Sequence, residues 1–396
     1  MAENTNDTKQ TLTGLARRLG QLPGDKKRAA LEMSAALAGV SLRVSREFVE
    51  AVPKAAKILS ADDLRHWGEL GRRLAMGNAD TGATFFADGV SGLKLVPDYA
   101  RHLIFQICTR QLVLSSSISL ATFKLIPQIA KEIGDEKLLT AVLTLASEIA
   151  QRSAKHSSEF LESTPGVARA LGRFGEKKGE VAAAVLELAS QFANRTGGMT
   201  ADLWAGLPSS LDKLTSENAI LLIRSAGEFL EFGGSVTLHF VSSGSDVLLA
   251  TGPAFDEWCR LARLIARQGN AVLISFLRAT PKFFGAFRKN SRGSTFDDLT
   301  SVLRLTAKIA ETDAESALAA FKSSPGVLNR VTIDQFEQWV ETGLSELETH
   351  SSKARRSYFA LETRASNERL HKTRLGLPLE KIQTILRMYV EALTGK

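Results

Sequence analysis

One short phrase recurs along this chain of 396 residues, and it limits the fold more than any other feature of the sequence. The clearest copies are Phe160-Leu161-x-x-Thr164-Pro165, Phe276-Leu277-x-x-Thr280-Pro281 and Ala320-Phe321-x-x-Ser324-Pro325. Copies without the proline begin at Phe85, Phe240 and Tyr358. Counting seven units between positions 85 and 358 gives a mean period of 39 residues. A period near 40 is typical of helix-pair repeats of the HEAT and TPR type.

A large apolar residue precedes most copies of the phrase by 18 or 19 residues. The residues in this slot are Trp67, Val142, Leu222, Trp258 and Trp339. A tryptophan that keeps register with a repeat is better explained by core packing than by ligand stacking. Because one helix pair cannot bury its apolar face alone, neighbouring pairs must stack. The sequence therefore predicts an all-α fold, an α-solenoid of HEAT/TPR-like helix pairs.

Local signals agree with helices. Apolar residues recur at helical spacing in the segments 138–149, 297–311 and 379–393. Capping boxes are predicted at Ser60-x-x-Asp63, Thr312-x-x-Glu315 and Thr332-x-x-Gln335. The Thr-Pro or Ser-Pro that ends each phrase is predicted to begin a helix, with the hydroxyl at the N-cap and the proline at the first helical position.

The stretch 233–250 is ambiguous by pattern alone. Val236, Leu238 and Phe240 alternate as in a strand, and glycines and serines flank them as in hairpin turns. The register of the repeat favours a helix there, and a helix is our prediction.

Positive charge is concentrated near the C-terminus. The whole chain carries a net charge of +7, and residues 351–396 hold ten Lys or Arg against four Glu. We therefore expect a polar N-terminal arm and first helix over 1–40, and solenoid repeats over 41–350. Basic C-terminal helices that continue the solenoid are expected over 351–396.

Six basic residues of this last region form the candidate interaction surface: Arg355, Arg356, Arg364, Arg369, Lys372 and Arg374. Clustered Lys and Arg are the electrostatic footprint of nucleic-acid binding. Aromatic residues among them are limited to Tyr358 and Phe359, which belong to the repeated phrase. A solvated basic face, or one that docks an acidic protein, is therefore the favoured interpretation.

The sequence offers no pattern for catalysis. It contains no P-loop, Rossmann glycine pattern, HExxH or GxSxG. Asp63-x-x-His66 and Glu368-x-x-His371 do not complete a di-iron set and are interpreted as solvated helix faces. We predict a protein that is not an enzyme, with no catalytic residue, no metal ligand and no cofactor.

Cellular location follows from the ends and the cysteines. The start, MAENTNDTKQ, is polar and lacks the apolar stretch of a secretory signal. The two cysteines, Cys108 and Cys259, cannot build a disulfide framework and are expected to be buried apolar side chains. These features predict a cytoplasmic protein that does not bind membranes.

The C-terminal region resembles a known family. The motif Phe336-x-x-Trp339-x-x-x-Gly343, the run ARRSYFALET at 354–363 and the segment 379–395 carry the resemblance. They are similar to the helical region of bacterial von Willebrand factor A-domain adaptor proteins of the nitric-oxide-reductase-activation and rubisco-activation type. The resemblance covers about the last 60 residues. It implies a non-catalytic adaptor whose partner is a MoxR-type AAA+ ATPase or a subunit carrying a von Willebrand A domain.

In that family the helical region is followed by an A domain with the metal site Asp-x-Ser-x-Ser. No aspartate here fits this motif, and the nearest match, Asp298-x-Thr300-x-Val302, fails at its third position. The chain is therefore expected to be the helical half of an adaptor, as a natural short form, a separately encoded half or a fragment. The alternative is a HEAT-like nucleic-acid-binding protein that uses the basic C-terminal helices.

Overall fold

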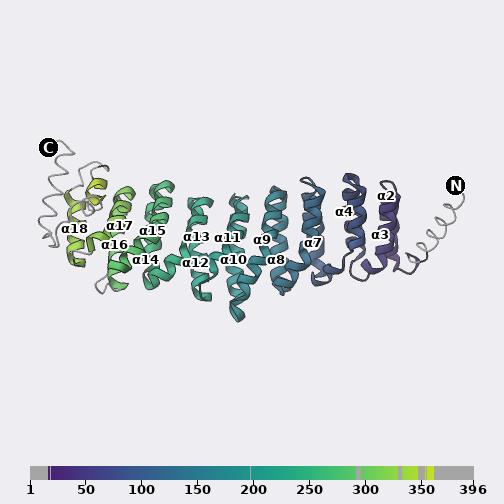
Figure 1. Ribbon diagram of the computed structural model, residues 1–396, viewed down its shortest axis with the longest axis horizontal. Coiled ribbons are helices and arrows are strands. Elements are labelled where there is room, and N and C mark those ends of the chain that lie inside the picture. Colours follow the sequence, from purple (N-terminus) through teal and green to yellow (C-terminus); the bar gives the residue numbers. More distant parts are fainter. Residues whose placement is uncertain are drawn as a thin grey trace. The chain divides into compact units, whose positions relative to one another are not determined.

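Helices account for the regular structure of the part of the chain that is described. The structure is a computed structural model that describes residues 17, 19–196, 198–290, 296–328, 332–346, 353 and 355–360. Within these residues the protein is all-α, with no strand (Figure 1). The all-α prediction is confirmed. The chain divides into two compact units, Met1–Pro208 and Ser209–Lys396.

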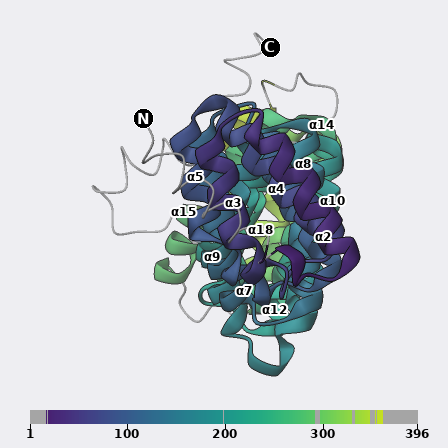
Figure 2. The same ribbon diagram turned by 90° about the vertical axis from the view of Figure 1, so that its right-hand side faces the viewer.

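The first unit, called unit 1, consists of two layers of helices. Its α-helices are α2 (Gly24–Ala38), α3 (Leu42–Ala55), α4 (Ala61–Gly77), α5 (Ala79–Asp88), α6 (Arg101–Gln111), α7 (Ser116–Ile133), α8 (Glu136–Arg152), α9 (Ala154–Gly172), α10 (Lys178–Thr196) and most of α11 (Met199–Leu211). Short 3₁₀ helices are η1 (Ser91–Leu95), η2 (Asp98–Ala100) and η3 (Gly175–Lys177). Even-numbered helices pack on one another in order from α2 to α10, and odd-numbered helices do so from α3 to α9. Figure 2 shows α2 and α4 in one layer and α3 and α5 in the other.

The second unit, called unit 2, is built in the same way. It contains α12 (Ser216–Glu228), η4 (Phe229–Phe232), α13 (Gly234–Thr251), η5 (Gly252–Ala254), α14 (Phe255–Gln268), α15 (Asn270–Asn290), α16 (Phe296–Thr312), α17 (Ala314–Leu328) and α18 (Ile333–Glu346). Helix α15 packs on α13 and α17, while α16 packs on α14 and α18. Helix α13 covers the ambiguous stretch 233–250, so the prediction of a helix there is confirmed.

Tryptophans form the centre of the core, as the sequence predicts. Trp67, Trp258 and Trp339 are at most 1% exposed, and Trp204 is equally buried. Each tryptophan of the repeated slot packs against the first aromatic residue of the following phrase. The ring centroids lie 6.1 Å apart for Trp67–Phe85, 5.9 Å for Trp258–Phe276 and 6.0 Å for Trp339–Tyr358.

The expectation that Thr-Pro or Ser-Pro begins a helix is wrong. Pro165, Pro281 and Pro325 lie inside α9, α15 and α17. The hydroxyl that was expected to cap a helix donates instead to a carbonyl of the preceding turn, which is the alternative bond of Ser and Thr inside helices. These bonds join Thr164 to Phe160 O (2.8 Å), Thr280 to Phe276 O (2.9 Å) and Ser324 to Phe321 O (2.9 Å).

Interior prolines mark the odd-numbered helices of each unit. Among the described helices they occur at Pro53, Pro127, Pro165, Pro208, Pro281 and Pro325. All six lie in odd-numbered helices, and α5 and α13 are the odd-numbered helices from α3 to α17 without one. The two layers therefore differ in their sequence as well as in their position.

Helix caps follow the predictions at two of three places. Ser60 and Asp63 form a capping box at α4, and Thr332 and Gln335 exchange the same two bonds at α18. The prediction of a cap at Thr312 is wrong, because α16 continues through that residue and Asp313 caps α17 by accepting from Ser316 N at 3.2 Å. The aspartate side chain supplies the oxygen that the hydroxyl of Thr312 was expected to supply.

Serine hydroxyls form hydrogen bonds between the two layers of unit 1. Each donates to a backbone carbonyl eleven residues earlier, in the preceding even-numbered helix. The bonds run from Ser45 to Ser34 O (2.9 Å), from Ser119 to Cys108 O (2.8 Å) and from Ser157 to Ala146 O (2.9 Å). Each serine stands four residues after the serine that caps its own helix. One local sequence pattern thus begins the odd-numbered helix and binds it to its partner.

Candidate binding groove

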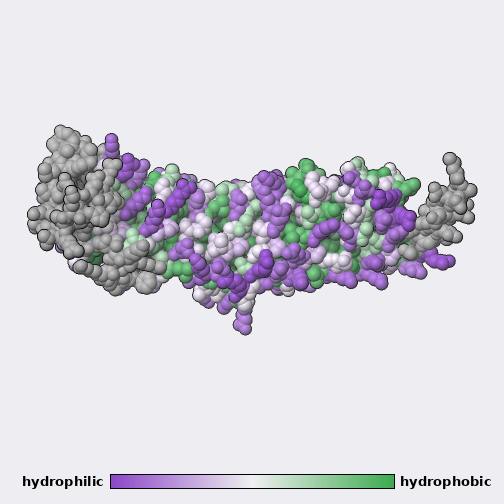
Figure 3. Space-filling view, in the orientation of Figure 1, coloured by the Kyte–Doolittle hydropathy of each residue, from purple (hydrophilic) through white to green (hydrophobic). Residues whose placement is uncertain are grey.

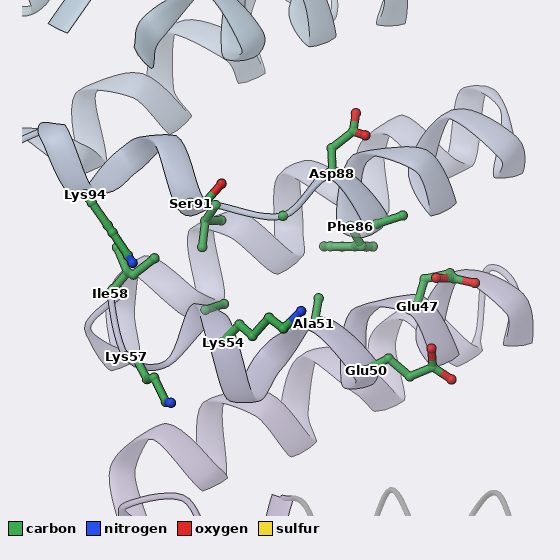
Figure 4. Close-up of a pocket in the computed structure, with 14 residues that line it drawn as sticks. Glu47, Glu50, Ala51, Lys54, Lys57, Ile58, Phe86, Asp88, Ser91 and Lys94 are labelled. Atoms are coloured by element: carbon green, nitrogen blue, oxygen red, sulfur yellow. The ribbon is translucent and has the colours of Figure 1, made fainter. Parts of the chain in front are cut away.

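A short helix opens a groove in the odd-numbered layer of unit 1. Helix α5 has 10 residues, whereas α3 has 14 and α7 has 18. It ends at Gly89, whose φ of 69° lies in the region that favours glycine, and the chain continues through η1 and η2. The missing turns leave a groove of about 730 Å³ between α3 and the segment 86–94 (Figure 4).

Charge changes sign along this groove. Figure 4 shows Glu47 and Glu50 towards one end of the α3 wall, and Lys54 and Lys57 towards the other. Lys94 approaches the same end from η1, and Figure 4 shows the amino group of Lys54 between the two walls. The three lysines, here called the groove lysines, make one end of the groove basic.

The groove lysines differ in their pairing from Glu50 and Asp88, two of the three acidic residues that line the groove. Glu50 binds Arg46 at 3.0 Å, and Asp88 on the opposite wall binds Lys124 of α7 at 2.6 Å. In the described part of the chain, no carboxylate lies within ion-pair distance of Lys54, Lys57 or Lys94. All three are exposed. Their positive charge is therefore not compensated by a direct contact.

The floor of the groove is apolar. Figure 4 shows Ala51 and Ile58 on the α3 wall and Phe86 on the opposite one, and Ala55 and Val90 also line the groove. Phe86 is fully buried and packs edge-on against Trp67, with ring centroids 4.9 Å apart. A ligand would therefore meet charge at the rim and hydrocarbon below it.

A buried arginine fixes the wall that carries Lys94. Arg101, the first residue of α6, is 5% exposed. Its guanidinium donates to Ile58 O at the end of α3 and to Leu93 O of η1, the latter at 3.2 Å, and pairs with Asp98 at 2.7 Å. Because one side chain binds both walls, the width of the groove at its basic end is set by a charged hydrogen-bond network.

The other side of η1 packs on α7. A Cβ atom added to Gly92 would lie 2.1 Å from Cγ of Pro127, so the backbone there touches the proline directly. A smaller hollow of about 260 Å³ lies beside this contact, between the segment 85–93 and α7. The segment 89–93 is thus held between α3 and α7 and forms a fixed ridge.

The predicted basic surface is described only in part. Arg356 forms an ion pair with Glu315 of α17. Arg355 is half-buried, and its Nε has no hydrogen-bond partner among the described residues. Arg364, Arg369, Lys372 and Arg374 lie outside the described residues, as does the predicted helix over 379–393. The structure therefore brings Arg356 to an acidic neighbour within the same unit.

The histidine and cysteine predictions have mixed outcomes. The interpretation of Asp63 as part of a solvated face is wrong, because its buried carboxylate completes the capping box of α4; His66 is exposed. Glu368 and His371 lie outside the described residues. No group of three or more His, Cys, Asp or Glu residues in the described part is arranged to hold a metal ion.

Both cysteines are buried, as predicted. Burial raises the pKa of the Cys108 thiol far above its ordinary range, and it raises the pKa of the Cys259 thiol to about 12. Neither thiol is therefore a nucleophile at neutral pH.

The groove itself was missed at the level of sequence. Its basic residues come from α3 and from η1, forty positions apart, so no run of charge marks them. The early end of α5 leaves no clear signal either. Gly89 stands where three copies of the phrase have a serine or threonine before proline, but the Phe240 copy has Gly244 at the same position and α13 continues through it.

The surface outside the groove is mixed. Figure 3 shows hydrophilic and hydrophobic residues alternating over the described helices. No helix in the described part combines the length and apolar character that crossing a bilayer requires.

Comparisons with protein-family models, with curated proteins and with solved structures found no match.

Proposed function

We propose that this chain is an α-solenoid of HEAT/TPR-like helix pairs with a period of about 39 residues, and that it serves as a non-catalytic scaffold for protein interaction in the cytoplasm. The observation that carries the proposal is the packing of helices on the next helix but one, from α2 to α10 and from α3 to α9 in unit 1, and from α13 to α17 and α14 to α18 in unit 2. Stacked helix pairs expose an extended surface that can vary without disturbing the core.

The interior prolines support the period. Their successive separations are 74, 38, 43, 73 and 44 residues, each close to one or two periods. Pro127 and Pro208 fall near positions 123 and 200, where the repeated phrase is not legible. The serine bonds that span eleven residues supply a second marker, with Ser45, Ser119 and Ser157 separated by 74 and 38.

As the partner of this scaffold we propose a MoxR-type AAA+ ATPase, or a von Willebrand A-domain subunit of the same system. The support is the C-terminal resemblance, carried by Trp339, Gly343 and the run 354–363. In the structure Trp339 packs on Phe359 with ring centroids 5.2 Å apart, and Gly343 lies against the same ring, so these residues are part of the core.

The test is a tagged pull-down of the full chain from its native host, at moderate salt, after nuclease treatment and with mass-spectrometric identification. Repeated recovery of one such ATPase or A-domain protein is the expected outcome. A purified ATPase is then added to the purified chain with and without nucleotide. If no ATPase binds under either condition and none is recovered from cells, the adaptor proposal is wrong.

Nucleic-acid binding is the second candidate, favoured by the excess of basic residues in 351–396. It predicts affinity that falls steeply as salt rises, because each phosphate contact releases counterions. A filter-binding titration with DNA and RNA at several salt concentrations measures this slope. Absence of binding at the lowest salt would exclude this candidate.

A further inference from the structure

We propose that the groove between α3 and η1 binds a short acidic segment of a partner protein, with the carboxylates of that segment on the groove lysines Lys54, Lys57 and Lys94. This inference rests on the proposed scaffold function and names the chemistry of one partner segment. The three lysines come from α3, from the turn that follows it and from η1, and all three line one cavity of about 730 Å³ (Figure 4).

Charge complementarity selects an acidic ligand for this end. Three exposed ammonium groups share the basic end without an ion pair to any described carboxylate. The nearest acidic side chain of the opposite wall, Asp88, is already bound to Lys124 at 2.6 Å. A ligand carboxylate at this end gains Coulomb attraction from ammonium groups that no described carboxylate neutralises.

The acidic end of the groove favours a peptide over a nucleic acid. Glu47 and Glu50 line the same α3 wall one to three turns before the groove lysines. A uniform polyanion lying along the groove would place phosphates beside these carboxylates. A peptide can carry acidic residues at one end and neutral or basic residues at the other, and it thereby matches both ends.

Size and shape fit a short extended segment. Glu47 and Lys57 are ten residues apart, and eight of these steps lie within α3, so the span is about 12 to 15 Å. This length corresponds to roughly four or five residues of extended chain. Ala51 and Ile58 are half-buried and give one side chain of such a segment an apolar contact.

The basic end of the groove is also preformed. Arg101 binds both walls, and η1 packs directly on Pro127, so the basic end keeps its width without a ligand. A site that is already formed does not spend binding free energy on ordering itself.

The experiment is selection from a phage-displayed library of random twelve-residue peptides on the full-length protein. Selected peptides are then synthesised with a fluorophore, and their affinities are measured by anisotropy. We expect Asp and Glu to be enriched near one end and an apolar residue to follow. The same peptides with Gln and Asn in place of Glu and Asp are expected to lose binding by at least about tenfold, the scale of one charge-assisted contact.

Two triple variants locate the site. Lys54→Glu, Lys57→Glu and Lys94→Glu together are expected to abolish binding of the acidic peptides. The matched control, Lys131→Glu, Lys137→Glu and Lys282→Glu, changes the net charge equally at exposed positions outside the groove and is expected to bind as the wild type does. Circular dichroism verifies that both variants keep their helix content.

Three outcomes would overturn the proposal: selected peptides without acidic enrichment, equal loss of affinity in both triple variants, or no enrichment at all. A single-stranded oligonucleotide of matched charge is titrated in parallel, and its tighter binding at the groove lysines would also overturn it. The scaffold proposal is judged separately, because a partner recovered equally by the wild type and the groove variant binds elsewhere on the chain.

Discussion

Arg101 shows how a single buried side chain shapes a binding surface. Its guanidinium is 5% exposed, yet the carboxylate it pairs with, Asp98, is almost fully exposed, so most of its stabilisation comes from the two backbone carbonyls. Those carbonyls belong to Ile58 and Leu93, one on each wall of the groove. The residue is therefore both part of the core and the support of the groove.

Arg101→Met is expected to lower the free energy of unfolding of unit 1 by about 2 to 4 kcal/mol, because two buried carbonyls lose their donor. Asp98→Asn is the control and is expected to change it by less than about 1 kcal/mol, since an exposed ion pair contributes little. Urea denaturation followed by circular dichroism measures both. Equal effects of the two variants would show that the carbonyl bonds are unimportant.

The buried cysteines predict a pH dependence. The pKa of Cys259 rises from its ordinary value of 9.0 to about 12 in the fold, mainly through burial. The unfolded chain therefore loses this proton first, so the stabilising contribution is complete below pH 9.0 and is lost as pH rises towards 12.

Cys259→Ala is expected to flatten the fall in the free energy of unfolding between pH 9 and pH 11 relative to the wild type. A thiol-reactive dye at pH 8 is expected to label neither cysteine until denaturant is added. Rapid labelling of the folded protein would contradict the burial of these side chains.

At the scale of the element, sequence reasoning succeeded where one residue type has one role. Tryptophans at a fixed distance before an aromatic residue predicted core positions, and Trp67, Trp258 and Trp339 are buried there. It failed at Thr-Pro, because the same hydroxyl can cap a helix or bond to the preceding turn. Only tertiary packing decides between these. The buried Nε1 of Trp204 in α11 donates to Thr164 of α9 at 3.1 Å.

The groove marks the same limit for the candidate site. Basic residues were sought where they cluster in sequence, at 351–396, whereas the groove lysines come from two elements that meet only after folding. Their convergence depends on the length of α5 and on Arg101, neither of which leaves a pattern in charge.

Two glycines inside helices of unit 1 make a matched pair. A Cβ atom on Gly71 of α4 would lie 2.0 Å from the Phe86 ring, whereas Gly206 of α11 has no atom within 4 Å of that position. Gly71→Ala is expected to destabilise unit 1 by about 1 to 3 kcal/mol through overpacking. Gly206→Ala is expected to stabilise it by about 0.5 to 1 kcal/mol, because alanine restricts the unfolded chain.

Thermal and urea denaturation of both variants checks this prediction. If both substitutions destabilise the protein, helix propensity does not determine the change in the free energy of unfolding caused by Gly206→Ala. Stabilisation by both would mean that α4 and α5 are less closely packed than the distance to Phe86 requires.

At the scale of the whole molecule, contacts are local in sequence. The extensive contacts between described α-helices join helices that are at most three apart along the chain. In a stacked array of this kind, stability is a sum of terms from each unit and its neighbours. The effect of a destabilising substitution in one helix pair is therefore expected to stay within that pair and its neighbours.

Native-state hydrogen exchange tests this locality. Gly71→Ala is expected to speed exchange in α4, α5 and α6 and to leave α14 to α17 unchanged within error. Peptide-level mass spectrometry resolves these segments in one experiment. A uniform increase in exchange over all helices would contradict local coupling and favour a single cooperative core.

The serine bonds across eleven residues have a further consequence for biosynthesis. An odd-numbered helix needs only the helix just before it to satisfy this bond, as Ser45, Ser119 and Ser157 do. The two helices of each pair can therefore pack together before the following part of the chain has left the ribosome. Because contacts are local in sequence, folding can advance with translation. A pause or truncation during synthesis would then leave the completed helix pairs packed, and only the last pair would expose the apolar face that the next pair covers.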